Sequence, residues 1–344
     1  MYKVWKRPDI ETRFVQNVRP SVDETEEDSI DIVEPGNYAL VENPKHIYQT
    51  FNNCGPATLS MILSWYGVNV SQEELGTKMR PYQVSSGDND DKTIFTYEFV
   101  DWAEAYGLEA IGRVNGDIDL LKKFTTNGIP VVVKTWLHPN DDIGHFRIVR
   151  GFDDKKQVVI QDDSYEGPNI SIRYYDFLSM WQPFNYNYII VFTPELKEKV
   201  EVIISEEINE KIAWENALKR AEQEKNIDPK SPYPGFNIST SSYHLGDFDK
   251  SVSEFEKVES SLPRRMLWYQ IEPIIAYQEL GNYDRVFEIT DNILENGNRA
   301  FSELYVIRGE IYLDRGDEDA AKEQFDLAIK YNSNFKDTVS ISED

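Results

Sequence analysis

Residues 48–57 read YQTFNNCGPA, and residues 58–67 continue as TLSMILSWYG. Apolar residues in the second stretch recur at helical spacing, and Gly67 suits the end of a helix. Pro56 suits the first turn of that helix, where a missing backbone N–H costs little. We therefore predict a helix over about 55–67, with Cys54 at its N-terminal end.

Cys54 is the single cysteine of the 344-residue chain, which excludes an intramolecular disulfide and zinc sites built from cysteine pairs. A lone cysteine is an inert core residue, an accidental surface residue or a nucleophile. A thiol acts as a nucleophile in its thiolate form, which the positive end of a helix dipole stabilises. An inert core cysteine more often lies on the buried face of a helix, and Gly55 leaves room for a substrate backbone. These observations favour the nucleophile.

The composition argues against several classes of protein. The net charge of −25 argues against nucleic-acid and anionic membrane partners, and an apolar fraction of 40% is enough for folded cores. No apolar run approaches the ~18 residues of a membrane span, and the N-terminus lacks an apolar signal core. The length predicts about two domains. We expect residues 1–35 to form an N-terminal arm and an acidic loop.

Residues 36–195 show helical patterns first and strand patterns afterwards. Helices followed by antiparallel strands form an α+β pattern. Beyond the helix at Cys54, we predict helices over 71–79, 96–106 and 117–127 and strands over 129–134, 145–152, 158–161 and 189–192.

A nucleophilic cysteine needs a base. The chain has four histidines, His46, His138, His145 and His244. His145 follows Gly144 at the start of an alternating strand, a rim position from which an imidazole can reach a helix end. His46 lies too close to the cysteine in sequence, His138 lies in a polar loop, and His244 lies in the helical C-terminal region. We predict that His145 is the general base; the competing interpretation is a strand histidine that faces solvent.

A carboxylate or amide should orient the base. Asp162 and Asp163 end the next strand, and antiparallel pairing would bring that end beside the start of the His145 strand. Acid pairs at strand ends are usually turn residues, and either aspartate suits the orienting role. Gln49 lies five residues before Cys54, near enough to serve as an oxyanion donor together with the Cys54 N–H. Its alternative is an ordinary loop glutamine.

Two clusters of oxygen ligands have competing interpretations. Residues 88–91 read DNDD, which has oxygen-rich spacing but lacks the glycine and bidentate glutamate of a calcium loop, so a solvated turn is favoured. His138, Asp141 and Asp142 near His145 suggest a metal, but the role of base explains His145 better. The chain has no glycine-rich phosphate loop. We expect no cofactor and no metal.

Three motifs, in the order Cys, His, Asp, resemble one known family. YQTFNNCGPA looks like the nucleophile motif of the bacteriocin-processing cysteine peptidases that cut double-glycine leaders, and is closer still to their stand-alone, transporter-free relatives. Residues 144–154, GHFRIVRGFDD, look like the family's histidine strand, and residues 163–168, DSYEGP, look like its aspartate turn. The resemblance spans about residues 40–195.

This resemblance implies a papain-like α+β domain over residues 36–195. It also implies a role for each matching residue: Cys54 as nucleophile, His145 as general base, Asp163 as orienting carboxylate with Asp162 as the alternative, and Gln49 as oxyanion donor.

The sequence departs from the family pattern in several places. Asn53 stands where transporter-linked members often have Asp, and Ser164 replaces a common proline. The gap from Gln49 to Cys54 is one residue shorter than in those members, though similar to the stand-alone ones. These departures bear on specificity for double-glycine leader peptides more than on the catalytic chemistry.

The rest of the chain has a helical pattern. Short phrases around Gly246, Gly281 and Gly316 recur at a spacing of 35 residues, each between two helical stretches. A helix–turn–helix unit of that period resembles tetratricopeptide repeats. The alternative is an unrelated helical bundle. We predict a linking helix within 196–230 and tetratricopeptide-type repeats over 231–344.

The combined prediction is a cysteine peptidase that hydrolyses peptide bonds, with a helical-repeat groove for a peptide or protein partner. Two alternatives stay open. One is a catalytically silent peptidase-like scaffold that acts through its repeats, and the other is a thiol amidase or transferase on the same fold. Stand-alone relatives are often exported, which favours an extracytoplasmic location over a cytoplasmic one.

Overall fold

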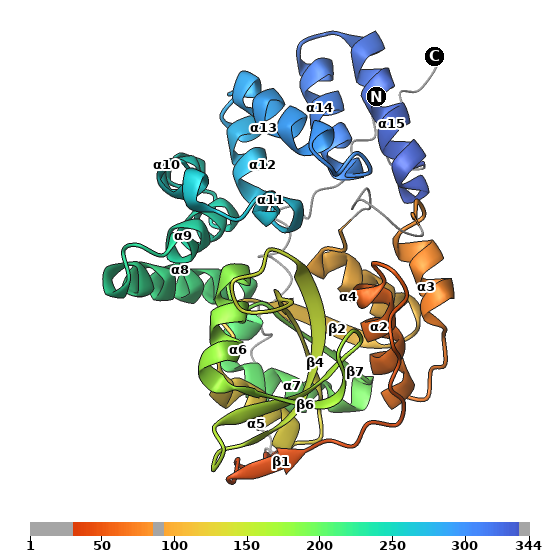
Figure 1. Cartoon of the computed structure of the whole chain (residues 1–344), viewed down its shortest axis with the longest axis vertical. Coiled ribbons are helices and arrows are strands. Elements are labelled where there is room, and N and C mark those ends of the chain that lie inside the picture. The colour runs from red at the N-terminus through yellow and green to blue at the C-terminus, as the bar shows by residue number, and fades with distance from the viewer. Residues whose placement is uncertain (1–29, 85–92, 337–344) are drawn as a thin grey trace, which may run out of the picture.

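The computed structural model describes residues 30–84 and 93–336. The expected N-terminal arm, most of the acidic loop and the DNDD turn at 88–91 lie outside these residues. Among the residues described, no helix is both long and apolar enough to cross a bilayer. The chain forms a sheet flanked by helices, followed by an array of helices (Figure 1).

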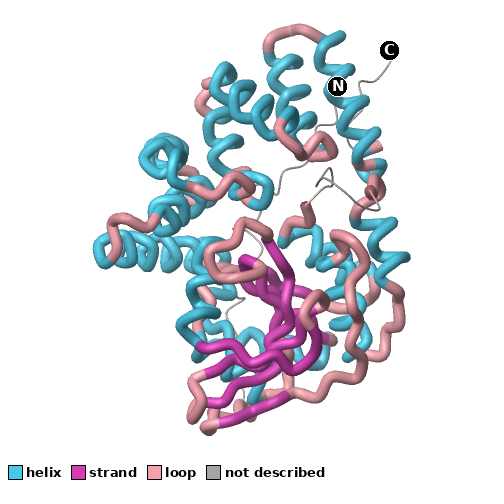
Figure 2. The backbone as a smooth tube through the Cα atoms, viewed as in Figure 1, coloured by secondary structure: helices cyan, strands magenta, loops and turns pink. Residues whose placement is uncertain are grey.

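The N-terminal part is built around one antiparallel sheet, whose described strands gather between the helices (Figure 2). The strand order is β2-β7-β3-β4-β5-β6, and β1 also pairs with β4. The long β4 therefore lies near the middle of the sheet. The strands are β1 (Tyr38–Leu40), β2 (Glu109–Arg113), β3 (Val131–Trp136), β4 (Gly144–Asp153), β5 (Val158–Asp163), β6 (Gly167–Arg173) and β7 (Tyr188–Phe192).

Helices cover both faces of this sheet. Val132 and Ile148 join one apolar cluster, whereas Val131 and Val149 join another on the opposite face. Successive strand residues point to opposite faces, so a strand buried on both sides is apolar throughout. The first face carries α2 (Cys54–Trp65), α3 (Gln72–Met79) and α4 (Thr96–Ala105), and the second carries α5 (Ile118–Thr126), α6 (Tyr174–Trp181) and α7 (Lys197–Ile204).

The α+β class predicted from the sequence is confirmed, as are the predicted helices and strands of this region. The sheet is larger than predicted, because β1, β2 and β6 were not expected. Each of these is short or polar: β1 has three residues, and β6 reads GPNISIR with mostly exposed side chains. Edge strands of this kind lack the apolar run by which a buried strand is recognised.

The C-terminal part is an array of helices. It begins with α8 (Glu210–Ile227), which lies within residues 196–230, and α11 (Met266–Tyr269) lies between the first and second of three helix pairs. These pairs are α9 (Pro232–His244) with α10 (Phe248–Val258), α12 (Glu272–Glu279) with α13 (Tyr283–Glu295), and α14 (Ser302–Asp314) with α15 (Glu318–Tyr331).

The three glycine phrases make the same turn within these pairs. Gly246, Gly281 and Gly316 have φ values of 80°, 70° and 76°, which side-chain-bearing residues rarely adopt. The residue after each glycine donates its N–H across 2.9 Å to a carbonyl of the preceding helix, as the Schellman motif requires. The 35-residue period is therefore a period of helix-ending turns. The bonds run from Asp247 to Ser242, from Asn282 to Tyr277 and from Asp317 to Tyr312.

The helical array packs directly on the sheet domain. Phe95, Trp136 and Phe184 of the N-terminal part share one apolar cluster with buried residues of the array. Near the C-terminal end of the array, the Asn334 side chain donates to the Lys78 carbonyl of α3 across 2.9 Å. The array therefore arches over the sheet domain and touches it at both ends (Figure 1).

Candidate active site

The loop that leads to α2 is anchored from α3. Gln72, which is buried, donates to the Tyr48 carbonyl across 2.8 Å and accepts the Thr50 N–H across 2.9 Å. Arg80 donates to the Asn53 side-chain oxygen across 2.9 Å. Buried polar groups with satisfied partners favour one arrangement of the backbone. The thiol is therefore presented on a fixed loop at the first residue of α2.

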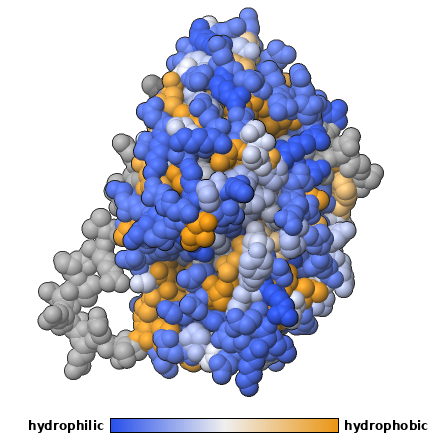
Figure 3. Space-filling view, turned by 60° about the vertical axis from the view of Figure 1, so that its left-hand side comes forward, coloured by the Kyte–Doolittle hydropathy of each residue, from blue (hydrophilic) through white to orange (hydrophobic). Residues whose placement is uncertain are grey.

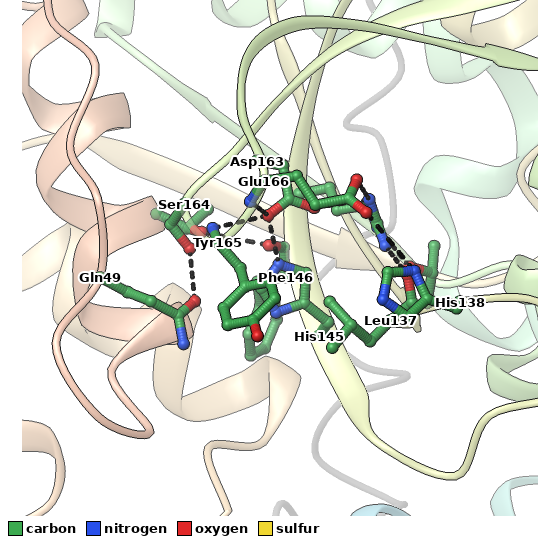
Figure 4. A network of polar contacts seen from close by, with 12 residues as sticks. Gln49, Leu137, His138, His145, Phe146, Asp163, Ser164, Tyr165 and Glu166 are labelled. Atoms are coloured by element: carbon green, nitrogen blue, oxygen red, sulfur yellow. Dashed lines mark hydrogen bonds and ion pairs between the residues drawn. The ribbon is translucent and has the colours of Figure 1, made fainter.

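His145 lies beside the first turn of α2, as the second residue of β4. Its imidazole hydrogen-bonds the Cys54 thiol, and its Nε2 lies 2.9 Å from Asp163 Oδ1. Because Asp163 engages Nε2, Nδ1 is the ring nitrogen left for the thiol. Three of the residues predicted to be catalytic thus form one hydrogen-bonded row, of which Figure 4 shows the His145–Asp163 half.

The electrostatics of the pair favour a thiolate beside an imidazolium. Burial alone would raise the pKa of the Cys54 thiol, but the hydrogen bond and charge of His145 lower it below its usual value. Burial alone would lower the pKa of His145, but hydrogen bonds to Asp163 and Cys54 raise it to about 9. The interaction between Cys54 and His145 contributes to both shifts, so the two groups titrate as a pair. Such a pair supplies a thiolate near neutral pH.

Asp163 is held by several donors at once. Besides the imidazole, Oδ1 accepts the N–H groups of Tyr165 (2.7 Å) and Glu166 (3.0 Å), and Oδ2 accepts Arg147 Nη1 at 2.5 Å. Burial alone would raise the pKa of Asp163, but the bond from His145 and the Arg147 charge hold it far below its usual range. The carboxylate therefore stays ionised and fixes the imidazole ring (Figure 4).

Asp162, the alternative acid, points away from His145. Its Oδ2 lies 2.9 Å from Arg150 Nε, and its Oδ1 accepts the Asn169 N–H at 2.9 Å. Neighbouring residues of a strand face opposite sides of a sheet, so only one of two consecutive aspartates can face the imidazole. In this structure the residue that faces it is Asp163.

Gln49 is joined to the aspartate turn by two hydrogen bonds. The Ser164 hydroxyl donates to Gln49 Oε1 across 2.8 Å, and the Gln49 N–H donates to the Ser164 carbonyl across 2.7 Å. Because the amide oxygen is engaged by Ser164 (Figure 4), the amide NH₂ is the end left to donate to another group. An oxyanion donor must present an N–H, so this geometry suits the role predicted for Gln49.

Large apolar side chains are exposed around these residues. Tyr48, Phe51, Ile143 and Tyr165 are all exposed, and each lies within a few residues of a segment that carries a candidate catalytic residue. The face shown in Figure 3 is mainly hydrophilic, with apolar residues in scattered groups. The rim of the site therefore offers apolar surface to a bound chain.

The remaining histidines have other partners, and His46 comes nearer to the site than its sequence position suggested. Within residues 30–84 and 93–336, no three His, Cys, Asp or Glu side chains are grouped to hold a metal ion. Asp142, one of the residues considered for a metal, pairs with Arg265 at 2.5 Å. The histidine contacts are His46 Nε2 with the Asp163 carbonyl oxygen (3.0 Å), His138 Nδ1 with Glu166 (3.4 Å), and His244 with Glu272 (3.3 Å).

Sequence reasoning missed Arg147. It lies two residues after His145, hence on the same face of β4, and it is paired in register with Asp163 of β5. A basic residue two positions after the histidine, opposite the acid of the next strand, is a pattern that can indicate an ion pair with that acid. Ser164 stands in the sequence only as a departure from a family pattern. Its hydrogen bond to Gln49 joins two segments far apart in sequence, so no local pattern indicates it.

Comparison with known proteins agrees with this architecture. A model described as the Peptidase C39 like family matches residues 39–189, and a tetratricopeptide repeat model matches residues 302–335. No curated protein sequence matches the chain significantly.

Several solved structures are similar to parts of the chain. A putative C39-like peptidase from Bacillus anthracis has 16% identity and a TM-score of 0.39, and the match covers 46% of this chain and 98% of that one. The peptidase domain of Streptococcus ComA, a bifunctional ABC transporter in a quorum-sensing pathway, has 19% identity and a TM-score of 0.33, over 43% and 96% of the two chains. A thermophilic tetratricopeptide protein of Thermus thermophilus has 17% identity and a TM-score of 0.29, over 35% and 67%. On the two family models, the chain carries a C39-like peptidase domain over residues 39–189, followed by a tetratricopeptide-repeat region.

Proposed function

We propose that the chain is a cysteine peptidase in which Cys54, His145 and Asp163 hydrolyse peptide bonds. The observation that carries this proposal is the hydrogen-bonded row from the thiol through the imidazole to the carboxylate. A nucleophile, a base and an orienting acid within hydrogen-bonding reach are the general signature of an activated nucleophile. The family match over residues 39–189 supports the same chemistry.

In the first half-reaction, the Cys54 thiolate attacks the carbonyl carbon of the peptide bond, and a C–S bond forms. The carbonyl π electrons move to oxygen, where the Gln49 amide and the Cys54 N–H donate hydrogen bonds to the oxyanion. When the tetrahedral intermediate collapses, the C–N bond breaks and the His145 imidazolium gives its proton to the leaving amine. The products are a thioester on Cys54 and a free amine.

In the second half-reaction, water attacks the thioester carbonyl while neutral His145 accepts a proton from that water. The C–S bond breaks, Cys54 leaves as thiolate and the carboxylic acid product departs. The thiolate–imidazolium pair is then restored. Asp163 stays ionised throughout, and its role is to orient the ring and to stabilise the imidazolium.

We assign recognition of a peptide or protein partner to the helical array and to the rim of the site. The tetratricopeptide match over residues 302–335 supports protein binding by the array, because such repeats present extended surfaces to partners. The exposed side chains of Tyr48, Phe51, Ile143 and Tyr165 support contact with apolar substrate side chains near the scissile bond.

Alkylation of Cys54 tests the catalytic proposal against the silent scaffold. Cys54 is the single cysteine, so iodoacetamide labelling reports on it alone. The rate should exceed that of free cysteine at neutral pH and titrate below the ordinary thiol pKa of ~8.5, and His145→Ala should remove that advantage. A rate no faster than free cysteine, with an ordinary titration, would exclude catalysis by Cys54. Cleavage of a peptide library then separates peptidase activity from amidase or transferase activity on the same fold.

A further inference from the structure

The helical array reaches the start of the histidine strand through α11. Arg265, just before this helix, pairs with Asp142 of the β3–β4 loop at 2.5 Å. Tyr269, the last residue of α11, lies against Gly144, the first residue of β4. A residue of the array therefore touches the backbone immediately before His145.

The contact between Tyr269 and Gly144 is close. A Cβ atom placed on Gly144 would lie 2.8 Å from two ring carbons of Tyr269, less than any real contact of that kind. Burial raises the pKa of the Tyr269 phenol, and the Gly144 N–H acts against that rise, which places this N–H near the phenol oxygen. Glycine thus lets the ring approach the strand closely, and the ring restrains the backbone at this point.

Tyr269 is itself anchored on the sheet domain. Its ring lies 5.7 Å from that of Trp136 and 6.0 Å from that of Phe184, measured between centroids. The next residue, Gln270, donates from its side chain to the Pro183 carbonyl across 2.8 Å. Aromatic contacts at these distances stabilise a particular arrangement of rings. The restraint on Gly144 therefore comes from a fixed support.

This position bears directly on the proposed catalytic row. Asp163 fixes the imidazole ring of His145 through Nε2 at 2.9 Å. The backbone position of His145 depends instead on the start of β4, where the β3–β4 loop ends. Burial raises the pKa of the Tyr269 phenol, and the negative charge of a Cys54 thiolate adds to that rise, so the phenol lies within electrostatic reach of the thiol. Tyr269 thus contacts the strand that carries the base, one residue before His145.

We propose that Tyr269 is a positioning residue of the peptidase site, through which the helical array holds His145 in line with Cys54. This inference rests on the proposed peptidase function. It makes the array part of the catalytic unit as well as a surface for partners. A misplacement of about 1 Å in a reacting group can cost about 10²-fold in rate, so a small shift of β4 is enough to be measured.

The test uses the full chain with Tyr269→Ala, Tyr269→Leu and Tyr269→Phe, and with Tyr277→Ala as a matched control. Tyr277 is a buried tyrosine of α12 whose ring packs edge-to-face against Phe255 within the array. The measurement is the rate of Cys54 alkylation by iodoacetamide as a function of pH, together with the melting temperature. Kcat and KM are added for any peptide that the wild type cleaves.

Tyr269→Ala should slow alkylation near neutral pH about tenfold and move its titration toward that of an ordinary thiol. Tyr269→Phe keeps the ring and should retain most of the wild-type rate, and Tyr277→Ala should keep the wild-type pH profile even if it melts earlier. Tyr269→Leu keeps apolar bulk and gives the answer if the alanine variant does not fold. The proposal is overturned if folded Tyr269→Ala or Tyr269→Leu keeps the wild-type profile, or if Tyr277→Ala changes it equally. If the wild type itself shows no activated thiol, the peptidase proposal fails instead.

Discussion

His145 Nε2 lies 2.9 Å from Asp163 Oδ1, and the same carboxylate accepts Arg147 Nη1 at 2.5 Å through its other oxygen. The acid is thus shared between a buried guanidinium and the imidazole. Arg147 keeps Asp163 ionised, and the negative charge of Asp163 stabilises the imidazolium form of His145 beside the thiol. Any change in this arrangement should appear in the titration of His145 and Cys54.

Replacement of the orienting acid should shift the pH dependence of hydrolysis. Asp163→Asn removes the negative charge that helps to raise the pKa of His145 to about 9. The alkaline limb of kcat/KM should move to lower pH by about 1–3 units. The measurement is a pH profile of peptide cleavage, with Asp162→Asn as the matched control. That control removes the carboxylate partner of buried Arg150, so it should cost about 3 kcal/mol of stability and leave the position of the limb unchanged. Equal shifts in both variants would contradict the assignment.

The wild type should have different pH limits for alkylation and for hydrolysis. As pH falls through the lowered pKa of Cys54, the thiolate is protonated and both rates fall. As pH rises through the His145 pKa of about 9, the leaving amine loses its proton donor, so hydrolysis falls while alkylation does not. Parallel measurement of both reactions across pH checks this. An alkylation rate that also falls above that pH would argue against separate roles for the two groups.

Gln49 and Ser164 should affect turnover without affecting the thiol. Gln49→Ala removes the proposed side-chain oxyanion donor and should lower kcat about 10²-fold. Ser164→Ala releases the amide oxygen held at 2.8 Å, so the amide can turn, and the loss should be smaller. Alkylation forms no oxyanion and should proceed at the wild-type rate in both variants. Slower alkylation in Gln49→Ala would mean that this residue acts on the thiol instead.

Gly151 should be needed for the pairing of β1 with β4. A Cβ atom there would lie 2.1 Å from the Ala39 carbonyl oxygen and 2.9 Å from the Leu40 Cα, which are backbone atoms and cannot turn away. Gly151→Ala should therefore lower the free energy of unfolding by about 1–3 kcal/mol. Chemical denaturation measures this, with Gly36→Ala as the control because no atom lies within 4 Å of its added Cβ. Equal stability of the two variants would contradict the close approach.

Local signals in the sequence were enough to predict most of the fold and to name the candidate residues of the site. The helix at Cys54 was marked by Pro56 and apolar periodicity, and the repeats were marked by Gly246, Gly281 and Gly316, whose positive φ values end each first helix. These features act within a few residues of their own position. The same holds for the alternation of β4, which placed His145 at the start of a strand.

Other features could not be predicted because they depend on contacts between distant segments. Arg147 is explained only by its register opposite Asp163, and the choice between Asp162 and Asp163 depends on which face of β5 meets β4. Tyr269 lies in a different domain, more than 100 residues after His145. Its relation to the site follows from the way the array packs on the sheet, which no local pattern encodes.

Hydrolysis of peptide bonds by Cys54 is best examined by cleavage of a diverse peptide library. Mass spectrometry of the library after incubation should show new termini with the wild type and none with Cys54→Ala or His145→Ala. Brief incubation should also show a thioester adduct on the peptide that carries Cys54. Absence of wild-type cleavage despite a reactive thiol, or cleavage that survives in Cys54→Ala, would contradict the claim.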